Sequence, residues 1–365
     1  MPQLMAGSSN HKDAELVRQF YEDSVEDQRN PVWASLARQY ASCVNAAETC
    51  NLLLQNINPL IAVLKAIELG LLDSRLRMTG VIHDSAGSLG RFRYLARRVM
   101  ATRRSQLSLI AVSESVRTAL CEAGVPAERV RKVVNGMDIE PFSRRIQRMR
   151  SEDTFSVVRQ RNRVPSDKKI VLMSARRVPW KGHVDLIHAV TQLVSAGDFD
   201  NSCVVINGAG LQDSRSMGYD SELRQLISGL HLTDTVFLLD QLTQDEVAAC
   251  YAAAHVAVLP SREPEPFGYA NIEAMLAGVP VVATAHGGPL EYITDSVSGL
   301  LIPPDHPAAL ATALRRLLRD PDLHDRIGSA GRASARRFTL DAMVDGYEAV
   351  IRSQTVGTIE RGITR

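Results

Sequence analysis

A regular alternation of apolar runs and helix-like segments in the C-terminal half constrains the fold of this chain more than any other feature. The apolar runs lie at residues 168–175, 202–208, 234–240, 255–261 and 279–284. Segments with helical spacing lie at residues 183–197, 221–232, 243–254, 269–278 and 306–320. Thr243 is a plausible N-cap and Gly278 a helix stop. Because the strands are apolar throughout, they are typical of a parallel sheet that helices cover on both faces.

The N-terminal half shows the same pattern less clearly. Strands are expected at 51–57, 77–83, 107–113 and 129–136, and helices at 33–48, 59–72 and 114–124. A polar, arginine-rich stretch, 143–167, is the predicted linker between the halves. Because 365 residues are many for one domain, we expect two doubly wound α/β domains with parallel sheets, residues 1–163 and residues 164–337.

Composition excludes several function classes. Apolar residues make up 45 %, charged residues 23 %, and the net charge is +1, which gives no field that would attract nucleic acid. None of the five cysteines belongs to a CxxC pair. Neither a zinc site nor a disulfide framework is therefore indicated, and we expect a reducing, cytoplasmic location. No apolar run approaches about 18 residues, and the N-terminus lacks the pattern of a signal peptide.

Two carboxylates flank a glycine after the apolar run 255–261. Glu265 precedes Gly268, where a helix is expected to begin, and Glu273 lies on that helix. A helix start offers free backbone N–H groups to a phosphate, and two carboxylates roughly 12 Å apart along a helix can each accept hydrogen bonds from a diol. The spacing suits a nucleotide sugar, with its sugar at one end and its ribose at the other. The alternative is that Glu265 is a surface charge and Glu273 a solvated helix residue.

Cations follow the first apolar run of the C-terminal half. Arg176 and Lys181 lie on the loop 174–183. A diphosphate leaving group needs cations, and these two supply a fork and a point charge; a solvated basic loop is the alternative. His83 ends an apolar run in the N-terminal half, where it can hydrogen-bond a reacting sugar or be a satisfied core histidine. Since ligands bind outside the carboxyl ends of parallel strands, we expect all these residues to face one cleft.

Other patterns are weaker signals. INGAG (206–210) resembles half of a dinucleotide fingerprint, but Asp213 replaces its third glycine, so we interpret it as a tight turn. DFD (198–200) matches an acidic metal-binding signature, yet it precedes a strand and is interpreted as a surface loop. HDSAGS (83–88) lacks a nucleophile elbow, which argues against a hydrolase triad, and no His/Cys cluster has metal-ligand spacing.

The stretch 91–104 holds six arginines with apolar residues interleaved. It can lie on an anionic membrane surface or meet an anionic acceptor, so weak peripheral contact with the inner face of the membrane is one hypothesis. A solvated helix face is the alternative.

Taken together, these residues resemble the retaining GT-B glycosyltransferases of family 4. The similarity covers roughly residues 50–350, and the E-x7-E element of the family falls on Glu265 and Glu273. The other matching motifs are ARRVPWKG, INGAG, DTVFLLDQL, AVLPSREPEPFG, IEAMLAGVPVVAT, HGGPLEYI, SGLLIPP, VIHD, AVSESVRTAL and VVNGMDIEPF. The resemblance implies two Rossmann-like domains facing across a cleft, with a C-terminal helix in 338–365 that crosses back to the N-terminal domain.

The resemblance also implies a role for each matching residue. Arg176 and Lys181 would hold the donor diphosphate, Glu265 the donor sugar and Glu273 the ribose, and His83 would lie beside the sugar. The other donor-binding residues would be Leu239 near the base and Phe267, Gly268, Tyr269 and Ala270 around the phosphate. The reaction would transfer a hexose or N-acetylhexosamine from a nucleotide diphosphate sugar, commonly UDP, with retention. It would need no metal and no other cofactor, because the cations act on the diphosphate.

The N-terminal region departs from this family pattern. No first strand with a Gly-Gly loop is visible before His83, so we expect the N-terminal domain to lack that element. The acceptor is left open among natural products, lipid carriers and polysaccharides, as is the oligomeric state. The alternative functions are an inactive GT-B module that binds a nucleotide or a partner, and a nucleotide-sugar epimerase.

Overall fold

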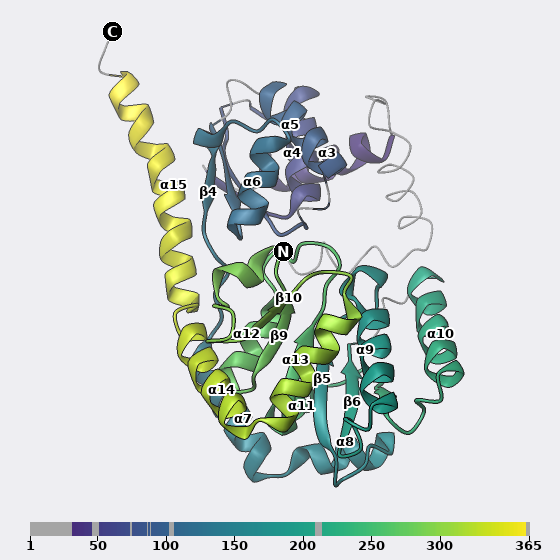
Figure 1. Cartoon of the computed structure of the whole chain (residues 1–365). Helices are drawn as coiled ribbons and strands as arrows, with labels where there is room; N and C mark the ends of the chain where they lie inside the picture. The colour runs from purple at the N-terminus through teal and green to yellow at the C-terminus, as the bar shows by residue number, and fades with distance from the viewer. Residues whose placement is uncertain are drawn as a thin grey trace. The chain divides into compact units, whose positions relative to one another are not determined.

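The computed structural model describes residues 31–45, 51–73, 75–85, 87, 89–101, 106–208 and 214–362 (Figure 1). The chain divides into two compact units, one of Met1–Asn135 with Met343–Arg365 and the other of Gly136–Ala342. Each unit is built around its own parallel sheet. The predicted α/β class with two parallel sheets is therefore confirmed.

The first unit contains a parallel sheet in the order β1-β2-β3-β4. Its strands are β1 (Asn51–Gln55), β2 (Arg77–Ile82), β3 (Gln106–Ala111) and β4 (Val130–Lys132). Its helices before the crossing are α3 (Pro31–Asn45), α4 (Ile57–Glu68), α5 (Leu89–Ala101) and α6 (Glu114–Glu122). The expectation that a first strand and a Gly-Gly loop are missing concerns residues 1–30 and 46–50, which lie outside the described part of the chain.

The basic stretch forms α5, and its apolar side faces the protein. Phe92, Leu95 and Val99 are buried, while Arg91 pairs with Asp84 at 2.5 Å. An apolar stripe that is already packed offers little surface to a membrane. The structure therefore favours the alternative of a helix with a solvated basic face, as far as residue 101; residues 102–105 lie outside the description.

The second unit has a six-stranded parallel sheet whose order reverses in the middle. The order is β10-β9-β8-β5-β6-β7, so the chain starts at β5, winds outward to β7, and then returns to β8 on the other side of β5. The strands are β5 (Lys169–Ser174), β6 (Ser202–Asn207), β7 (Val236–Leu238), β8 (Ala254–Leu259), β9 (Val281–Thr284) and β10 (Leu300–Ile302). Such a reversal opens a crevice at the carboxyl ends of the two central strands.

Helices pack on both faces of this sheet (Figure 1). They are α7 (Ile139–Ser151), α8 (Thr154–Asn162), α9 (His183–Ser195), α10 (Ser214–Gly229), α11 (Gln244–Ala253), α12 (Tyr269–Leu276), α13 (Pro307–Arg319) and α14 (Pro321–Ala335). Helix α9 contacts α13, whereas α11 contacts α7 and α8, and α12 contacts α14. The predicted helix boundaries at Thr243 and Gly278 are confirmed: Thr243 forms a capping box with Glu246, and Gly278 has a φ of +78° just after α12.

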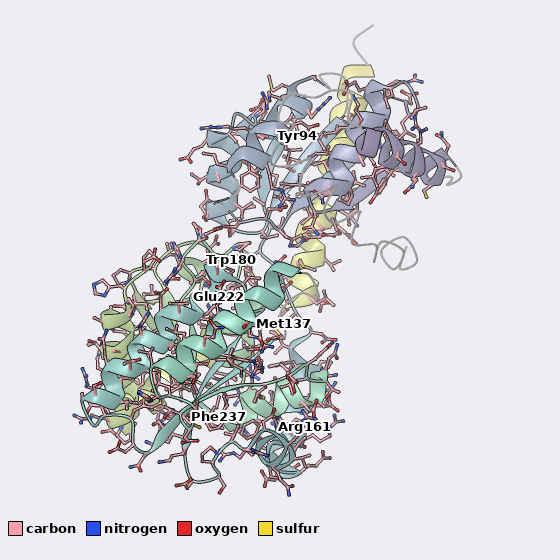
Figure 2. The ribbon with its side chains drawn as sticks, turned by 90° about the vertical axis from the view of Figure 1, so that its right-hand side faces the viewer. Tyr94, Met137, Arg161, Trp180, Glu222 and Phe237 are labelled. Carbon is pink, nitrogen blue, oxygen red and sulfur yellow. The ribbon has the colours of Figure 1, made fainter. Side chains whose placement is uncertain are left out.

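The arginine-rich stretch predicted as a linker is helical. It forms α7 and α8, and its arginines bind the second unit: Arg148 contacts Asp245 at 2.8 Å, and Arg161 contacts Glu246 at 2.7 Å (Arg161 is labelled in Figure 2). These ion pairs fix both helices to α11. For this reason the chain divides at residues 135/136 and 342/343, and not at 163/164 and 337/338 as the sequence suggested.

The last helix, α15 (Leu340–Gly362), passes from the second unit to the first. From Met343 onward it belongs to the first unit, where Gln354 donates a hydrogen bond to the carbonyl of Met78 at 2.9 Å. This agrees with the expected crossing of a C-terminal helix.

The DFD segment serves the fold of the second unit. It lies before β6, at the amino end of the sheet. The Asp198 side chain is only 6 % exposed and pairs with Arg315 and Arg319 of α13, whereas Asp200 is exposed. Asp198 is therefore a buried anchor for α13, and the interpretation of the whole segment as a surface loop is wrong for this residue.

We expect Asp198→Asn to destabilise the protein by roughly 1–3 kcal/mol, because an amide cannot neutralise two arginines and leaves charged groups without their partner. Asp200→Asn, two residues away on the exposed side, should change stability by no more than about 0.5 kcal/mol. Urea unfolding of both variants measures the difference, and equal midpoints for Asp198→Asn and the unmodified protein would contradict the anchoring role.

Candidate active site

Two loops meet at the carboxyl edge of the second unit, where the strand order reverses. One follows β5 and carries Arg176 and Lys181, and the other follows β8 and carries Glu265. The backbone joins them, since the Arg262 amide donates to the Trp180 carbonyl at 2.7 Å. The position therefore agrees with the crevice that a reversed strand order predicts.

Gly182 lets the loops approach closely. It has a φ of +81°, and a Cβ at this position would lie 1.9 Å from the carbonyl oxygen of Pro260. Any side chain would push the loops apart. The glycine of the ARRVPWKG motif is thus required by packing between β5 and β8.

Lys181 and Glu265 form an ion pair across this junction. Lys181 Nζ donates to both carboxylate oxygens of Glu265, to Oε2 at 2.8 Å. Glu265 is 2 % exposed, and the Lys181 ammonium also lies 4.1 Å from the centre of the Trp180 ring. Burial lowers the pKa of Lys181, and the Glu265 carboxylate opposes that shift. The sequence predicts both residues at this edge but not their contact with each other.

Arg176 and Arg177 have different environments although they are adjacent. Arg176 is exposed, and its charge acts on Lys181, lowering the pKa of the lysine further. Arg177 is buried; it pairs with Asp220 and donates to the Leu239 carbonyl at 2.8 Å. Arg176 is therefore the arginine available to a ligand. Arg177 was not predicted as a site residue, although the double arginine of ARRVPWKG could have indicated it.

Leu239 belongs to the interior of this edge. Its side chain is fully buried, its amide donates to the Ile206 carbonyl at 2.9 Å, and its carbonyl accepts from Arg177. It therefore forms the floor behind the loop that leaves β7. Of the neighbouring INGAG motif, Gly208 packs tightly on the Ala175 carbonyl, and the positions from Ala209 to Asp213 lie outside the described residues.

The start of α12 lies beside Glu265 and has no side-chain cap. Gly268 occupies the N-cap position with a φ of +91°, and a Cβ there would lie 2.7 Å from the Tyr292 hydroxyl. That hydroxyl donates to the Phe267 carbonyl at 2.9 Å and accepts from the Asn271 side chain at 3.0 Å. The buried Phe267 and Tyr292 thus hold the turn so that the first backbone amides of α12, at Tyr269 and Ala270, are available to an anion.

Glu273 lies one turn further along α12 and is half-buried. Its Oε2 accepts a hydrogen bond from the Tyr251 hydroxyl of α11 at 2.7 Å. Burial raises the pKa of Glu273, while the Tyr251 bond acts in the opposite direction. The alternative that Glu273 is a solvated helix residue is therefore not supported, because its carboxylate has a hydrogen-bond partner within the protein.

His83 lies in the first unit, directly after β2. Its Nε2 is 2.9 Å from Oε1 of Gln55, and burial lowers its pKa, which favours the neutral ring. Asp84 pairs with Arg91, so the HDSAGS segment shows no His–Asp pair of the hydrolase type among its described residues. Gln55 is the last residue of β1 and His83 follows β2, so both lie at the carboxyl edge of the first unit's sheet.

The described residues contain neither a metal-binding cluster nor a membrane-spanning helix. No group of three or more His, Cys, Asp or Glu side chains there could hold a metal ion. No described helix is long and apolar enough to cross a membrane.

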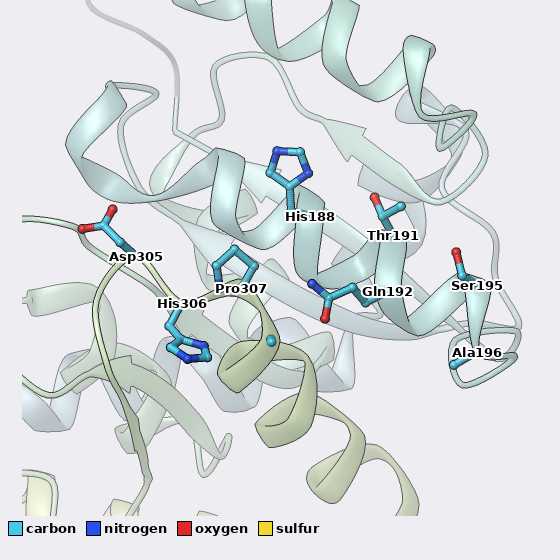
Figure 3. Close-up of a pocket in the computed structure, with 9 residues that line it drawn as sticks. His188, Thr191, Gln192, Ser195, Ala196, Asp305, His306 and Pro307 are labelled. Carbon is cyan, nitrogen blue, oxygen red and sulfur yellow. The ribbon is translucent and has the colours of Figure 1, made fainter.

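A hollow of about 820 Å³ lies elsewhere in the second unit, between α9 and the start of α13 (Figure 3). Side chains such as His188, Gln192 and His306 line it, and none of its lining residues is a predicted donor-binding residue. Its connection to the site is indirect: Asp305 at its rim pairs with Arg262, whose guanidinium also binds the buried Asp185 with two bonds of 2.7 Å.

We expect Lys181→Met to destabilise the protein by roughly 3–5 kcal/mol, because it leaves the buried Glu265 carboxylate without a counter-ion. The double variant Lys181→Met/Glu265→Gln should regain most of this loss, since no charge then stays buried. Arg176→Met changes an exposed cation on the same loop and should alter stability by no more than about 0.5 kcal/mol. Urea unfolding tests all three, and a Lys181→Met protein as stable as Arg176→Met would contradict the role of the pair.

Glu273→Gln should stabilise the protein at neutral pH. A carboxyl whose pKa is raised by burial binds its proton more tightly in the folded state than in the unfolded state. Its contribution to the stability of the protein is therefore complete at low pH and is lost as the pH rises through the raised pKa. The amide avoids this loss and can still accept from Tyr251. Thermal unfolding between pH 4 and pH 8, with the exposed Glu222→Gln as control (Glu222 is labelled in Figure 2), should show an advantage for Glu273→Gln alone that shrinks on acidification.

Several curated proteins with similar sequences carry the same name. The chain is 34 % identical over 233 residues to the D-inositol 3-phosphate glycosyltransferase of Streptomyces bingchenggensis, a match that covers 63 % of this chain and 50 % of that protein. It is 33 % identical over 217 residues to the protein of the same name from Frankia alni, covering 59 % of this chain and 51 % of that protein. The chain thus spans about half the length of the curated relatives it matches.

Solved structures resemble nearly the whole chain. The HepE protein of Anabaena in complex with UDP-glucose superposes with a TM-score of 0.70 at 25 % identity, covering 89 % of this chain and 82 % of that one. Sucrose-phosphate synthase from Thermosynechococcus elongatus superposes with a TM-score of 0.72 at 21 % identity, covering 90 % and 80 %. These likenesses, together with the two parallel sheets, confirm the GT-B fold class.

The region that holds the candidate site also matches a family. Residues 155–334, which include every element from β5 to β10, match the pattern of the family described as glycosyl transferases group 1. Through this segment the chain is similar to the glycosyl transferases group 1 family.

Proposed function

We propose that this protein is a retaining glycosyltransferase that moves a hexose or N-acetylhexosamine from a nucleotide diphosphate sugar, preferably a UDP sugar, to an acceptor hydroxyl. The observation that carries the proposal is the buried Lys181–Glu265 ion pair at the point where the strand order reverses. It places an ammonium and a carboxylate next to the uncapped start of α12. A ligand with an anionic centre and hydroxyl groups on both sides suits these groups.

In this proposal each group has one role. Lys181, Arg176 and the first amides of α12 hold the diphosphate, Glu265 accepts hydrogen bonds from the sugar, and Glu273 accepts them from the ribose. The cations stabilise the negative charge that develops on the departing diphosphate, and no metal is required for that purpose. The departing phosphate accepts the proton of the acceptor hydroxyl on the same face of the sugar, so that the configuration is retained. By the resemblance to family 4 we also assign His83 a role at the transferred sugar; in the first unit its ring is hydrogen-bonded to Gln55.

The names of the similar proteins support parts of this proposal. HepE was solved with UDP-glucose, which supports a UDP donor. The curated relatives are named for D-inositol 3-phosphate, which makes that phosphorylated cyclitol the first acceptor to test. We also propose a reducing, cytoplasmic location on the basis of cysteine usage; the cysteines in the described residues are free.

Thermal unfolding in the presence of UDP, GDP or ADP is the first test. A nucleotide that binds only the folded state should stabilise it by about 2.7 kcal/mol at a hundred times its Kd, and we expect UDP to act at the lowest concentration. Radiolabelled UDP sugars then separate the functions. Slow release or transfer of sugar indicates the transferase, interconversion of sugars indicates an epimerase, and binding without turnover indicates an inactive module.

Glu265→Gln should lower sugar transfer by about 100-fold or more, the order seen when a group that stabilises developing charge is removed, while UDP affinity changes by less than about threefold. The reason is that Glu265 is assigned to the sugar, whereas the diphosphate and the ribose have other partners. Glu263→Gln, an exposed neighbour on the same loop, is the matched control and should transfer normally. Undiminished transfer by a folded Glu265→Gln protein would refute the assigned role.

A further inference from the structure

Tyr251 is a buried tyrosine that reaches the edge of the candidate site. It lies on α11, is 1 % exposed, and packs edge-to-face on Phe142 of α7 with ring centres 6.4 Å apart. Its hydroxyl donates to Oε2 of Glu273 at 2.7 Å. Two helices that flank β8 are thus joined by a side-chain hydrogen bond next to the crevice.

The direction of this hydrogen bond is fixed by chemistry. Burial raises the pKa of Tyr251 well above its ordinary value, so the phenol keeps its proton and can donate it. The Ser174 side chain, at the end of β5, lowers the pKa of the same phenol and so opposes the effect of burial in part. The Tyr251 hydroxyl therefore links α11 to the carboxylate of Glu273 on α12.

The hydrogen bond from Tyr251 leaves one carboxylate oxygen of Glu273 for a ligand. Tyr251 occupies Oε2, and within the described residues Oε1 has no hydrogen-bond partner. A carboxylate held by one oxygen has a defined orientation, so the other oxygen offers its lone pairs in a fixed direction. A ribose has two adjacent hydroxyls. Both can donate to this oxygen, or each can donate to a different oxygen of the carboxylate.

We infer that Tyr251 is a positioning residue, which orients Glu273 toward the cis-diol of a bound ribose and so makes the site select ribonucleotides over 2′-deoxyribonucleotides. The inference rests on the proposed function, because it requires a nucleotide at this edge. The selectivity follows because a ligand without the 2′-hydroxyl leaves a partly desolvated carboxylate without a donor.

The experiment compares UDP with 2′-deoxy-UDP by calorimetry. The unmodified protein should prefer UDP by roughly 10-fold or more, the strength of a hydrogen bond to a charged group. In Tyr251→Phe the affinity for UDP should fall by about 5-fold or more, while that for 2′-deoxy-UDP should change by less than about twofold. In sugar transfer the donor KM should rise with kcat unchanged, because Tyr251 touches no reacting atom.

Two further variants separate orientation from a general loss of structure. Tyr219→Phe removes the hydroxyl of another buried tyrosine, one without a hydrogen-bond partner among the described residues, and should not alter the preference. In a Glu273→Gln background, adding Tyr251→Phe should have little further effect on the preference, because both changes act on one pair. The Tyr251 bond lowers the pKa of Glu273, so in Tyr251→Phe this carboxylate should become protonated at a higher pH. As the pH falls, any preference for UDP that this variant retains should therefore disappear at a higher pH than in the unmodified protein.

The outcomes are distinguishable. If the unmodified protein binds none of the nucleotides, the proposed function fails and this inference fails with it. If it binds UDP and prefers it, but a folded Tyr251→Phe protein keeps the full preference or loses affinity for both nucleotides equally, only the inference is overturned. Should Tyr251→Phe not fold, Glu273→Gln alone decides, since an unchanged preference in that variant excludes Glu273 as the group that Tyr251 orients.

Discussion

The contact between Lys181 and Glu265 organises the edge of the second unit that holds the candidate site. Glu265 is almost fully buried, and a buried carboxylate without a partner costs several kcal/mol. The loop after β8 can therefore adopt this conformation only if the loop after β5 brings Lys181 to it. Gly182 permits the close approach, and the Arg262–Trp180 hydrogen bond maintains it.

The same pair explains how a charged ligand can enter without a large penalty. In the proposed function, a nucleotide sugar offers phosphate oxygens to Lys181 and hydroxyl groups to Glu265. Each side chain then exchanges its ion-pair partner for a group of the ligand, so neither charge is without a partner before or after binding. In the free protein the ion pair thus satisfies the two charges that the ligand satisfies when it is bound. In this proposal the exposed Arg176 can attract the diphosphate before the exchange.

Much of the second unit could be predicted from sequence because its strands are apolar along their whole length. The elements that were missed lack this signal. Strand β10 has three residues, and α14 carries Gly328, which a helix normally disfavours. Here the glycine is needed, since a Cβ would lie 2.5 Å from the Gly278 carbonyl. Helix α7 looked like a linker because its arginines are visible in the sequence and their acidic partners, on α11, are not recognisable.

In the candidate site, too, some residues could be predicted from sequence and others could not. Residues that follow a strand, such as Arg176, Lys181 and Glu265, could be placed at one edge because parallel strands end together. Their partners could not, because a partner such as Tyr251 lies on a helix of small apolar residues, where a tyrosine looks like core packing. The ring of Tyr251 is indeed part of the core, whereas its hydroxyl belongs to the candidate site. A side chain with both properties is assigned only when the structure shows where its polar end lies, and here that end lies on the carboxylate of Glu273.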